Sequence, residues 1–205
     1  MSELDFSGKT VLVVGGSSGI GNGIAHGFLS RGAEVHVWGT RPSVEDYDAA
    51  NGSDLSGLTY SCVDVSDSAA IAAHQAGFDS LDVLVLSQGV VRYGQEEFEK
   101  PGWDYVMDVN IDSVMACASK YHALLAASHG ALIIVSSISG MQGNIGNPAY
   151  AASKAAAISL TKTSGQAWGR DGIRVNGLAP GLVPTKLTAV TTENEKRMQG
   201  ALRAI

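Results

Sequence analysis

The sequence has few cysteines and no long hydrophobic run, and each absence argues against a class of protein. Only two of its 205 residues are cysteines, Cys62 and Cys117, and their separation is not the spacing of a zinc site. With no signal peptide ahead of them, two isolated thiols are typical of a reducing compartment. No apolar run approaches the roughly 20 residues that a membrane helix needs. We therefore expect a cytoplasmic protein with neither a membrane span nor a metal centre.

Positive charge is also scarce. The chain carries 14 Lys and Arg against 20 Asp and Glu, a net charge of −6, and no run of basic residues occurs. This composition argues against nucleic acid or an anionic membrane as a partner. The five histidines are scattered and form no ligand cluster. Length and composition are those of a single-domain soluble enzyme, so we expect residues 1–205 to form one domain.

Short apolar, β-branched runs recur along the chain and end in glycine, serine or other turn residues. Such runs predict buried parallel strands when helical segments separate them. The predicted strands are residues 10–14, 34–38, 58–65, 81–86, 131–135 and 173–178. This alternation indicates right-handed crossovers and ligands at the carboxyl edge of the sheet. The predicted fold class is α/β, a doubly wound parallel sheet flanked by helices in three layers.

A glycine-rich turn follows the first predicted strand and opens a helix. It contains Gly15, Ser17, Ser18, Gly19, Ile20 and Gly21, with the spacing Gly-x-x-x-Gly-x-Gly. Glycines let the backbone turn tightly and let a pyrophosphate approach the helix N-terminus, where free N–H groups favour anions. Such turns also occur without a ligand. The turn is a candidate dinucleotide site.

The end of the second predicted strand bears on the choice of nicotinamide cofactor. In dinucleotide folds an acid here binds the ribose 2′-hydroxyl, whereas a nearby Arg accommodates a 2′-phosphate. This chain has Gly39 at the strand end and Arg41 two residues on. Arg41 could also be simply solvated. We favour NADP over NAD.

Two further strand ends offer cofactor contacts. Asp64, next to Val65, could accept a hydrogen bond from the adenine amino group, although an acid at a strand end is as often a local turn cap. Gly89 follows the fourth predicted strand and would allow a close backbone approach.

The segment 149–169 reads as a helix that carries Tyr150 and Lys154. Residues four apart lie one above the other on a helix face. Lowering a Tyr pKa from about 10 to about 7 needs roughly 4 kcal/mol. A charge about 4 Å away supplies about that much at an effective dielectric of about 20. Lys154 could therefore make Tyr150 a general acid or base at neutral pH. The alternative is an amphipathic helix that contains both residues by chance.

Other candidate polar groups lie near this helix in the predicted fold. Asn110 sits inside the predicted helix 101–128 and could be a tolerated solvent-facing residue, bend the helix or hold a water. Ser137 follows the fifth strand, thirteen residues before Tyr150, and could bind a substrate oxygen or make a turn bond. Residues 188–203 look helical.

Together these motifs resemble the short-chain dehydrogenase/reductase family, in its simple single-domain branch, from about residue 8 to residue 200. The residues that carry the resemblance are the three glycines of the turn, Asp64, Asn110, Ser137, Tyr150, Lys154, Arg174, Val175, Asn176, Pro180, Gly181 and Thr185. The resemblance implies a Rossmann-like fold. It also implies an NAD(P)-dependent oxidoreductase that transfers hydride between nicotinamide and a secondary alcohol or ketone. Carbonyl reductases, alcohol dehydrogenases and 3-oxoacyl reductases have this activity.

The resemblance also implies roles for individual residues. Tyr150 would move the proton, Ser137 would orient the reacting oxygen, and Lys154 would lower the Tyr pKa and bind the nicotinamide ribose. Asn110 would hold a water in the proton relay. Pro180, Gly181, Val183 and Thr185 would lie on the nicotinamide side of the cofactor. The substrate pocket would be lined by Val91, Tyr93, Ser139 and Met141.

The chain departs from the family pattern in three places, one of them Val14, where the family often has Thr before the first glycine. The family commonly has Asn-Asn-Ala-Gly after the fourth strand, where this chain has Leu86-Ser87-Gln88-Gly89. The substitution touches a turn that braces the cofactor. Similar proteins also run on by about forty residues, so the last helix and a seventh strand are expected to be missing after Ile205. The sixth strand would then be an unprotected edge.

We also expect a homo-oligomer, a dimer or tetramer, through the helices 101–128 and 149–169. Apolar residues that recur at spacings of three and four supply the contact face: Met107, Ile111, Val114, Met115 and Ala118. Two alternatives to the oxidoreductase stay open. One is a catalytically silent dinucleotide-binding regulatory or scaffold protein, and the other is a racemase or epimerase of the same fold.

Overall fold

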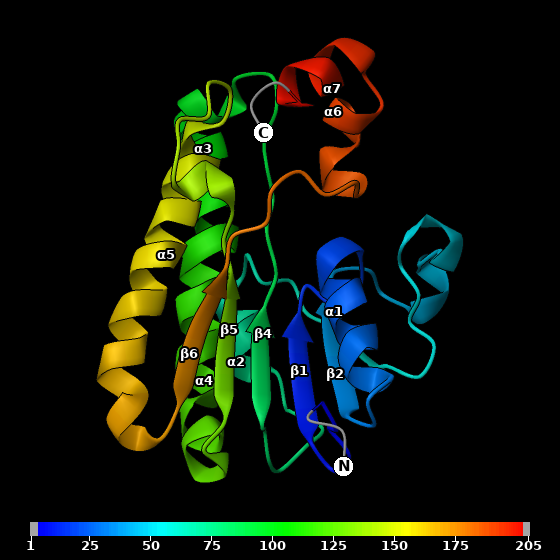
Figure 1. Cartoon of the computed structure of the whole chain (residues 1–205), viewed down its shortest axis with the longest axis vertical. Coiled ribbons are helices and arrows are strands. Elements are labelled where there is room, and N and C mark those ends of the chain that lie inside the picture. Colours follow the sequence, from blue (N-terminus) through cyan, green and yellow to red (C-terminus); the bar gives the residue numbers. More distant parts are fainter. Residues whose placement is uncertain (1–3, 203–205) are drawn as a thin grey trace.

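The computed structural model of the chain describes residues 4–202 and is built around a six-stranded parallel sheet. The strand order is β3–β2–β1–β4–β5–β6, so the chain winds outward from the centre in both directions, as Figure 1 shows. The strands are β1 (Thr10–Val14), β2 (Glu34–Gly39), β3 (Thr59–Cys62), β4 (Val83–Leu86), β5 (Ala131–Val135) and β6 (Arg174–Leu178). The predicted doubly wound α/β class is confirmed.

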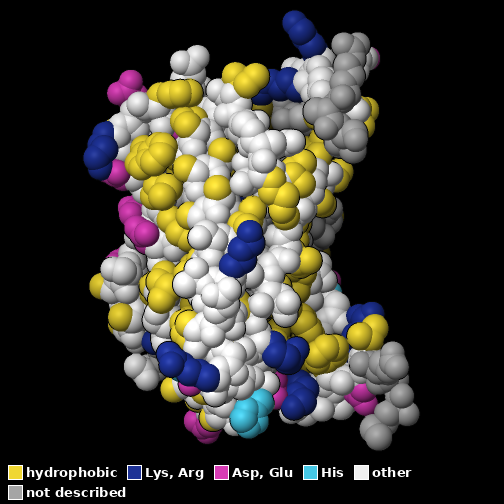
Figure 2. Space-filling view, turned by 60° about the vertical axis from the view of Figure 1, so that its left-hand side comes forward, with side chains coloured by type: hydrophobic (Ala, Val, Ile, Leu, Met, Phe, Trp, Pro, Cys, Tyr) yellow, Lys and Arg dark blue, Asp and Glu magenta, His cyan; other side chains and the backbone are white. Residues whose placement is uncertain are grey.

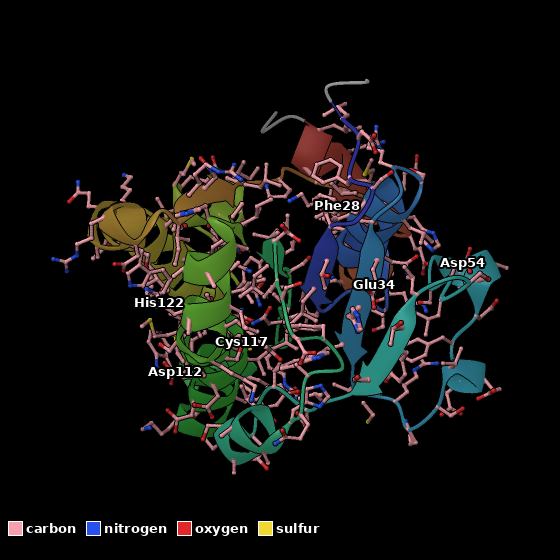
Figure 3. All side chains as sticks on the ribbon, turned by 90° about the horizontal axis from the view of Figure 1, so that it is seen from below. Phe28, Glu34, Asp54, Asp112, Cys117 and His122 are labelled. Carbon is pink, nitrogen blue, oxygen red and sulfur yellow. The ribbon has the colours of Figure 1, made fainter. Side chains whose placement is uncertain are left out.

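Helices cover both faces of the sheet. They are α1 (Gly19–Leu29), α2 (Ser68–Ala73), α3 (Lys100–Met107), α4 (Ser113–Ser128), α5 (Pro148–Trp168), α6 (Ala189–Thr192) and α7 (Glu195–Leu202). Figure 3 shows α4, with Cys117, on one side of the sheet and α1, with Phe28, on the other. Among the described residues, no helix has the length and apolar character needed to cross a membrane.

Side chains alternate between the two faces along each strand, which produces two apolar cores. Leu12, Leu84 and Leu132 pack with α2, α4 and α5 on one face. Val13 and Val85 pack with α1 on the other. The central strands are buried on both faces, which explains why they read as continuous apolar runs rather than as alternating ones.

The carboxyl ends of all strands meet at the upper edge of the sheet in Figure 1. The chain leaves β1 and β4 there in opposite directions, because β1 is followed by α1 on one face and β4 leads to α3 and α4 on the other. A gap between connections opens at this switch point, where ligands bind in open α/β sheets. The segment that follows β6 crosses the same edge and leads into α6 and α7.

The long helix predicted over 101–128 is interrupted. It consists of α3, a π-helical turn (Asp108–Asp112) and α4. The turn contains Asn110, whose amide bonds to a neighbouring segment instead of facing solvent. The solvent-facing alternative is therefore wrong, and the helix is interrupted at Asn110 by the π-helical turn.

Other predicted boundaries shift at the sheet edges. The strand predicted over 58–65 is shorter, because β3 ends at Cys62 and Val63 and Val65 continue as buried loop. The helical region predicted over 188–203 is divided between a 3₁₀ turn (Lys186–Thr188), α6 and α7, and its last residue lies outside the described part of the chain.

The predicted contact face on α4 is only partly available. Val114 and Ala118 are buried in this protein's own core, so they cannot meet a partner. Met115, one residue after Val114, is exposed. The apolar side of α4 is used by the parent sheet, which spacing alone could not reveal.

Candidate active site

The glycine turn adopts backbone geometry that side chains would prevent. Gly15 and Gly19 have φ values of +75° and +55°, in the left-handed region that favours glycine. A Cβ on Gly15 would lie 2.7 Å from the backbone nitrogen of Gln88, and one on Gly21 would collide with the carbonyl oxygen of Gly15. The first turn of α1 has no side-chain cap and no acidic residue. The turn therefore suits a pyrophosphate at the helix N-terminus.

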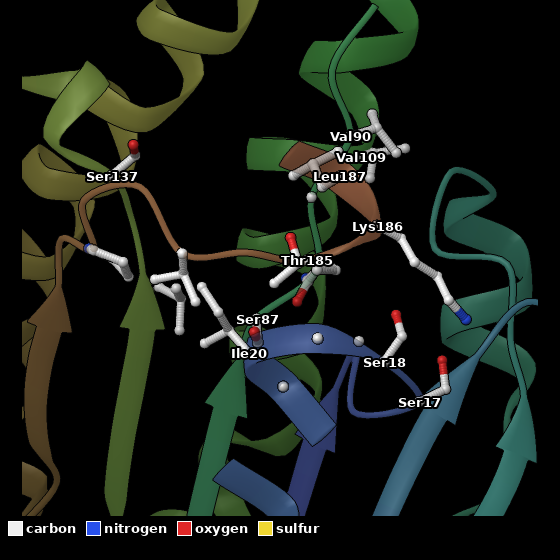
Figure 4. A pocket seen from close by; sticks show the side chains of 18 of the residues that line it. Ser17, Ser18, Ile20, Ser87, Val90, Val109, Ser137, Thr185, Lys186 and Leu187 are labelled. Atoms are coloured by element: carbon white, nitrogen blue, oxygen red, sulfur yellow. The ribbon is translucent and has the colours of Figure 1, made fainter. Parts of the chain in front are cut away.

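A cavity of about 310 Å³ runs along the carboxyl edge of the sheet from this turn to α5. It is lined by most of the residues predicted for the cofactor: Gly15, Ser17, Ser18, Gly19, Ile20, Gly21, Val65, Gly89, Tyr150, Lys154, Pro180, Gly181, Val183 and Thr185. The catalytic candidate Ser137 lines it as well. In Figure 4, Ser17, Ser18 and Ile20 lie at the glycine turn, Thr185 lies above it, and Ser137 lies toward the opposite end. One elongated space thus joins the candidate phosphate site to the candidate catalytic residues.

Lys154 is almost completely buried, with 4% of its surface exposed. Its ammonium donates to the carbonyl oxygen of Val135 at 2.9 Å, and burial lowers its pKa to about 8. The ammonium lies 5.7 Å from the centre of the Tyr150 ring. Lys154 lines the cavity and is held at the end of β5. It can therefore place a positive charge in the cavity wall up to about pH 8.

The Tyr150 phenol does not have the lowered pKa that the sequence suggested. Burial raises its pKa, the hydrogen bond with Ser137 lowers it, and the negative charge of Glu97 and the Tyr93 phenol raise it further. Lys154 is not among the groups that shift this pKa, and its ammonium donates to the Val135 carbonyl. In this structure Tyr150 is therefore kept as a phenol, the form that donates a proton.

Ser137 stands directly after β5 and faces Tyr150. It is the N-cap of a 3₁₀ turn, Ile138–Gly140, and its hydroxyl accepts a hydrogen bond from the backbone N–H of Ser139 at 3.1 Å. The same hydroxyl contacts the Tyr150 phenol. The turn-bond and substrate-oxygen alternatives are thus compatible, since the turn holds the hydroxyl beside the phenol.

Asn110 is fully buried and acts on the loop after β4. Its amide oxygen accepts the Val90 N–H at 2.8 Å, and its amide nitrogen donates to the Val90 carbonyl at 2.9 Å and to the Ser153 hydroxyl at 3.1 Å. Asn110 does not itself line the cavity. It holds Val90, which does, and ties this loop to α5. Its role in holding a water stays a prediction.

Two predicted cofactor contacts lie outside the cavity lining. The Arg41 guanidinium bonds to the Asp46 carbonyl and stacks 5.0 Å from the centre of the Tyr47 ring. Asp64 accepts the backbone N–H and the hydroxyl of Ser66 at 2.9 and 2.7 Å, which is the local turn cap already considered. Neither Arg41 nor Asp64 lines the cavity.

The predicted substrate residues lie beside the cavity rather than in its wall. Val91, Ser139, Met141 and Tyr93 are absent from the lining. Met141 is largely exposed, and the Tyr93 hydroxyl donates to the Leu187 carbonyl at 3.0 Å. Tyr93 thereby connects the loop after β4 to the segment after β6. These four residues stay predictions for the substrate pocket.

Gly39, Ser87, Gln88 and Val90, which lie at strand ends considered in the sequence, also line the cavity. The structure adds lining residues that the sequence did not single out: Trp38, Thr40, Val63, Val109, Val135, Ser136, Lys186, Leu187 and Thr188. Lys186 is the most informative, since its side chain extends across the cavity toward Ser17 and Ser18 in Figure 4 and its ammonium donates to the Ser53 hydroxyl at 2.9 Å. The sequence could have indicated Lys186 as a cavity residue, because it directly follows the predicted cofactor contact Thr185. In the part of the chain that the structure describes, no group of three His, Cys, Asp or Glu side chains could hold a metal ion.

Comparison with known proteins identifies related sequences and structures. The family model described as short chain dehydrogenase matches residues 9–196. A 3-oxoacyl-[acyl-carrier-protein] reductase of Chlamydia muridarum is 34% identical, covering 92% of this chain and 79% of the reductase. A 2-dehydro-3-deoxy-D-gluconate 5-dehydrogenase of Bacillus subtilis is 33% identical, covering 97% of this chain and 80% of that enzyme.

Solved structures agree with these relatives. The crystal structure of a putative 2-deoxy-D-gluconate 3-dehydrogenase from Agrobacterium tumefaciens with bound NADP matches with a TM-score of 0.86 at 30% identity. The match covers 100% of this chain and 84% of that one. A short-chain alcohol dehydrogenase structure from Sinorhizobium meliloti, described as putative, gives a TM-score of 0.87 at 28% identity, covering 98% of this chain and 83% of that one.

The glycine turn yields a prediction with a matched control on the same helix. Gly21→Ala should weaken NADPH binding at least about tenfold, which corresponds to about 1.4 kcal/mol, because its methyl group displaces the Gly15 carbonyl. Gly23→Ala meets nothing within 4 Å and should bind NADPH normally. Quenching or enhancement of NADPH fluorescence measures both. Equal affinities of the two variants would contradict the role assigned to the turn.

Proposed function

Because this chain belongs to the short-chain dehydrogenase/reductase family and is an NAD(P)-dependent oxidoreductase acting on CH–OH or C=O groups, we propose that Ser137, Tyr150 and Lys154 carry the reaction. The observation that supports this most strongly is their meeting at one end of the cavity that begins at the glycine turn. Asn110 supports them by holding the loop after β4.

A nicotinamide held in this cavity would supply hydride to a ketone carbon, or accept it from an alcohol. In the reduction, Tyr150 donates its phenolic proton to the carbonyl oxygen, so that the products are the alcohol and a phenolate. Ser137 donates a hydrogen bond to the same oxygen and holds it within reach of the phenol. Lys154 keeps a positive charge beside the phenolate and can bind the ribose hydroxyls. The reverse reaction uses the phenolate as the base.

Tyr150→Phe tests this assignment. Loss of the proton donor should lower the rate of ketone reduction by about 10²–10⁴-fold, while NADPH binding stays within a few-fold, since the hydroxyl is not a cofactor clamp. The measurement is NADPH oxidation followed by absorbance, with NADPH affinity from fluorescence. A variant that keeps more than about a tenth of the wild-type rate would show that another group moves the proton. A wild-type protein that binds NADPH but reduces no ketone would favour the silent dinucleotide-binding alternative.

The substrate is a secondary alcohol or ketone, and the relatives indicate two classes to screen. The Chlamydia relative is named for a 3-oxoacyl thioester and the Bacillus relative for a keto sugar acid. We propose a screen that includes ethyl acetoacetate as a small 3-oxo ester, keto sugar acids and simple ketones. Leu187 and Val183, which line the cavity and are partly exposed, favour a substrate with an apolar portion.

We propose NADP as the preferred cofactor. Gly39 is not the acid that would bind a 2′-hydroxyl, and a Cβ there would require the Tyr47 and Ser17 hydroxyl groups to move. Two cations are available instead, Lys186 in the cavity lining and Arg41 at the end of β2. A substitution of Gly39 by Asp would disturb these contacts and is unsuitable as a test.

Arg41→Ala and Lys186→Met test this preference. Each should raise the KM for NADPH, by about tenfold where the lost contact is a charged hydrogen bond to the 2′-phosphate, and leave the KM for NADH nearly unchanged. Arg31→Ala, an exposed Arg at the far end of α1, is the control. If a variant raised both KM values equally, its cation would contact a phosphate shared by the two cofactors. Unchanged KM values in both variants would contradict the cation assignment.

We further propose a homo-oligomer, a dimer or a tetramer of two dimers. Figure 2 shows hydrophobic side chains on one face of the molecule. The exposed hydrophobic residues in or near α3, α4 and α5 include Phe98, Trp103 and Met115. Light scattering should give at least a dimer for the wild type and a smaller species for Met115→Lys. Val44→Lys, in a 3₁₀ turn after β2, should behave as the wild type. A monodisperse wild-type monomer would contradict the proposal.

A cytoplasmic location also remains our proposal. Both cysteines are unpaired, Cys62 exposed and Cys117 buried, which fits a reducing compartment.

A further inference from the structure

Glu97 is a completely buried carboxylate that the proposed chemistry does not use. It lies in a 3₁₀ turn (Glu96–Phe98) before α3, and 0% of its surface is exposed, while its neighbours Glu96 and Phe98 are exposed. None of the ion pairs between described residues includes it. Burying a carboxylate without a cation is costly unless its oxygens are well hydrogen-bonded.

Three N–H donors satisfy this carboxylate. One oxygen accepts the backbone N–H of Arg92 at 2.9 Å and the side-chain amide of Asn147 at 3.2 Å. The other oxygen accepts the backbone N–H of Tyr150 at 2.8 Å. Asn147 also donates to the Arg92 carbonyl at 2.9 Å. The four residues form a closed network around one buried negative charge.

The Tyr150 N–H belongs to the first turn of α5, where backbone donors have no partner within the helix. The N-cap residue, Asn147, makes no side-chain cap bond there. Glu97 reaches this turn from a different segment and takes the position of a capping acid, which the helix dipole also favours. The catalytic phenol is thus carried by a backbone position that Glu97 fixes.

The network also connects Tyr150 to the loop after β4. Arg92 lies between Val91 and Tyr93, two residues expected beside the substrate. One carboxylate therefore links the segment that would face the substrate to the residue that would donate its proton.

We propose that Glu97 is a positioning residue for proton transfer: it caps the first turn of α5 and holds Tyr150 in register with the loop after β4. This rests on the proposed role of Tyr150. The alternative is that Glu97 stabilises the fold and has no effect on proton transfer. The two differ in what happens to the Tyr150 phenol when the carboxylate is replaced.

The polar, titratable and charged groups near the phenol, or acting on its charge, come from four segments. They are Tyr93 from the loop after β4, Glu97 from the turn before α3, Ser137 from the turn after β5, and Lys154 from α5 itself. The negative charge of Glu97 disfavours the phenolate. Its removal should therefore let Tyr150 ionise at lower pH.

Glu97→Gln keeps the length of the side chain, removes the charge and replaces one acceptor by a donor. With ethyl acetoacetate and NADPH, we expect kcat to fall by about 10–100-fold, the range for misplaced catalytic groups, with NADPH affinity nearly unchanged. The phenolate absorbance of Tyr150, taken as the difference from the matching Tyr150→Phe protein, should appear at lower pH than in the wild type. Glu96→Gln, an exposed neighbour, should match the wild type in every measurement.

Glu97→Asp covers the case in which Glu97→Gln fails to fold. It keeps the charge but is one methylene too short to reach all three donors, so kcat should fall without a downward shift of the phenolate titration. A Glu97 variant that loses thermal stability but keeps the wild-type kcat and titration would overturn the proposal. The titration needs no substrate, so it tests the proposal for Glu97 independently of activity. The proposed function fails on a different result, which is a Tyr150→Phe variant that keeps its activity.

Discussion

The hydrogen bond from the Lys154 ammonium to the Val135 carbonyl is the contact on which the site depends. It joins the last residue of β5 to the second turn of α5, and only 4% of Lys154 is exposed. The Ser136 hydroxyl donates to the Lys154 carbonyl at 2.6 Å, so β5 and α5 are bonded in both directions. Gly140 then passes so close to the helix that a Cβ would lie 2.6 Å from the Lys154 carbonyl carbon. These contacts bring Ser137 beside Tyr150.

Burial and hydrogen bonding have opposite effects on the charged forms of Lys154 and Tyr150. Burial disfavours the charge on Lys154 and disfavours the phenolate of Tyr150. The hydrogen bond to Val135 stabilises the ammonium, and the Ser137 hydroxyl stabilises the phenolate. The resting structure therefore holds a neutral phenol close to an ammonium that can lose its proton near pH 8. Such a pair suits a site that donates a proton in one direction of a reaction and accepts it in the other.

The sequence was sufficient for the sheet, the glycine turn and the helix that carries Tyr150. Continuous β-branched runs buried on both faces have few alternative structures, and Gly15 and Gly21 are required by close backbone approaches that side chains would block. The meeting of Ser137 and Tyr150 followed from the same topology, since both follow the fifth strand at the carboxyl edge.

Tertiary contacts determined what the sequence could not predict. Asn110 lies in the π-helical turn that interrupts the long helix, and its amide bonds to Val90. Val114 and Ala118 were expected at a partner surface and instead fill the core. The pKa of Tyr150 was expected to fall because spacing places Lys154 nearby, but spacing does not say where an ammonium points. Glu97 resembled its exposed neighbour Glu96 in sequence and differs only because three donors converge on it.

The most direct test of the account is the pH dependence of NADPH binding, from roughly pH 6 to pH 10 around the lowered pKa. Lys154 carries its proton below its pKa of about 8 and loses it above. If the ammonium binds the cofactor, the NADPH dissociation constant should be nearly constant between about pH 7, where the 2′-phosphate is already ionised, and about pH 8, and should rise above pH 8. Lys154→Met should bind NADPH weakly at all pH values, without this inflection. A wild-type dissociation constant that does not change through pH 8, or the same inflection in Lys154→Met, would contradict the central place given to this buried lysine.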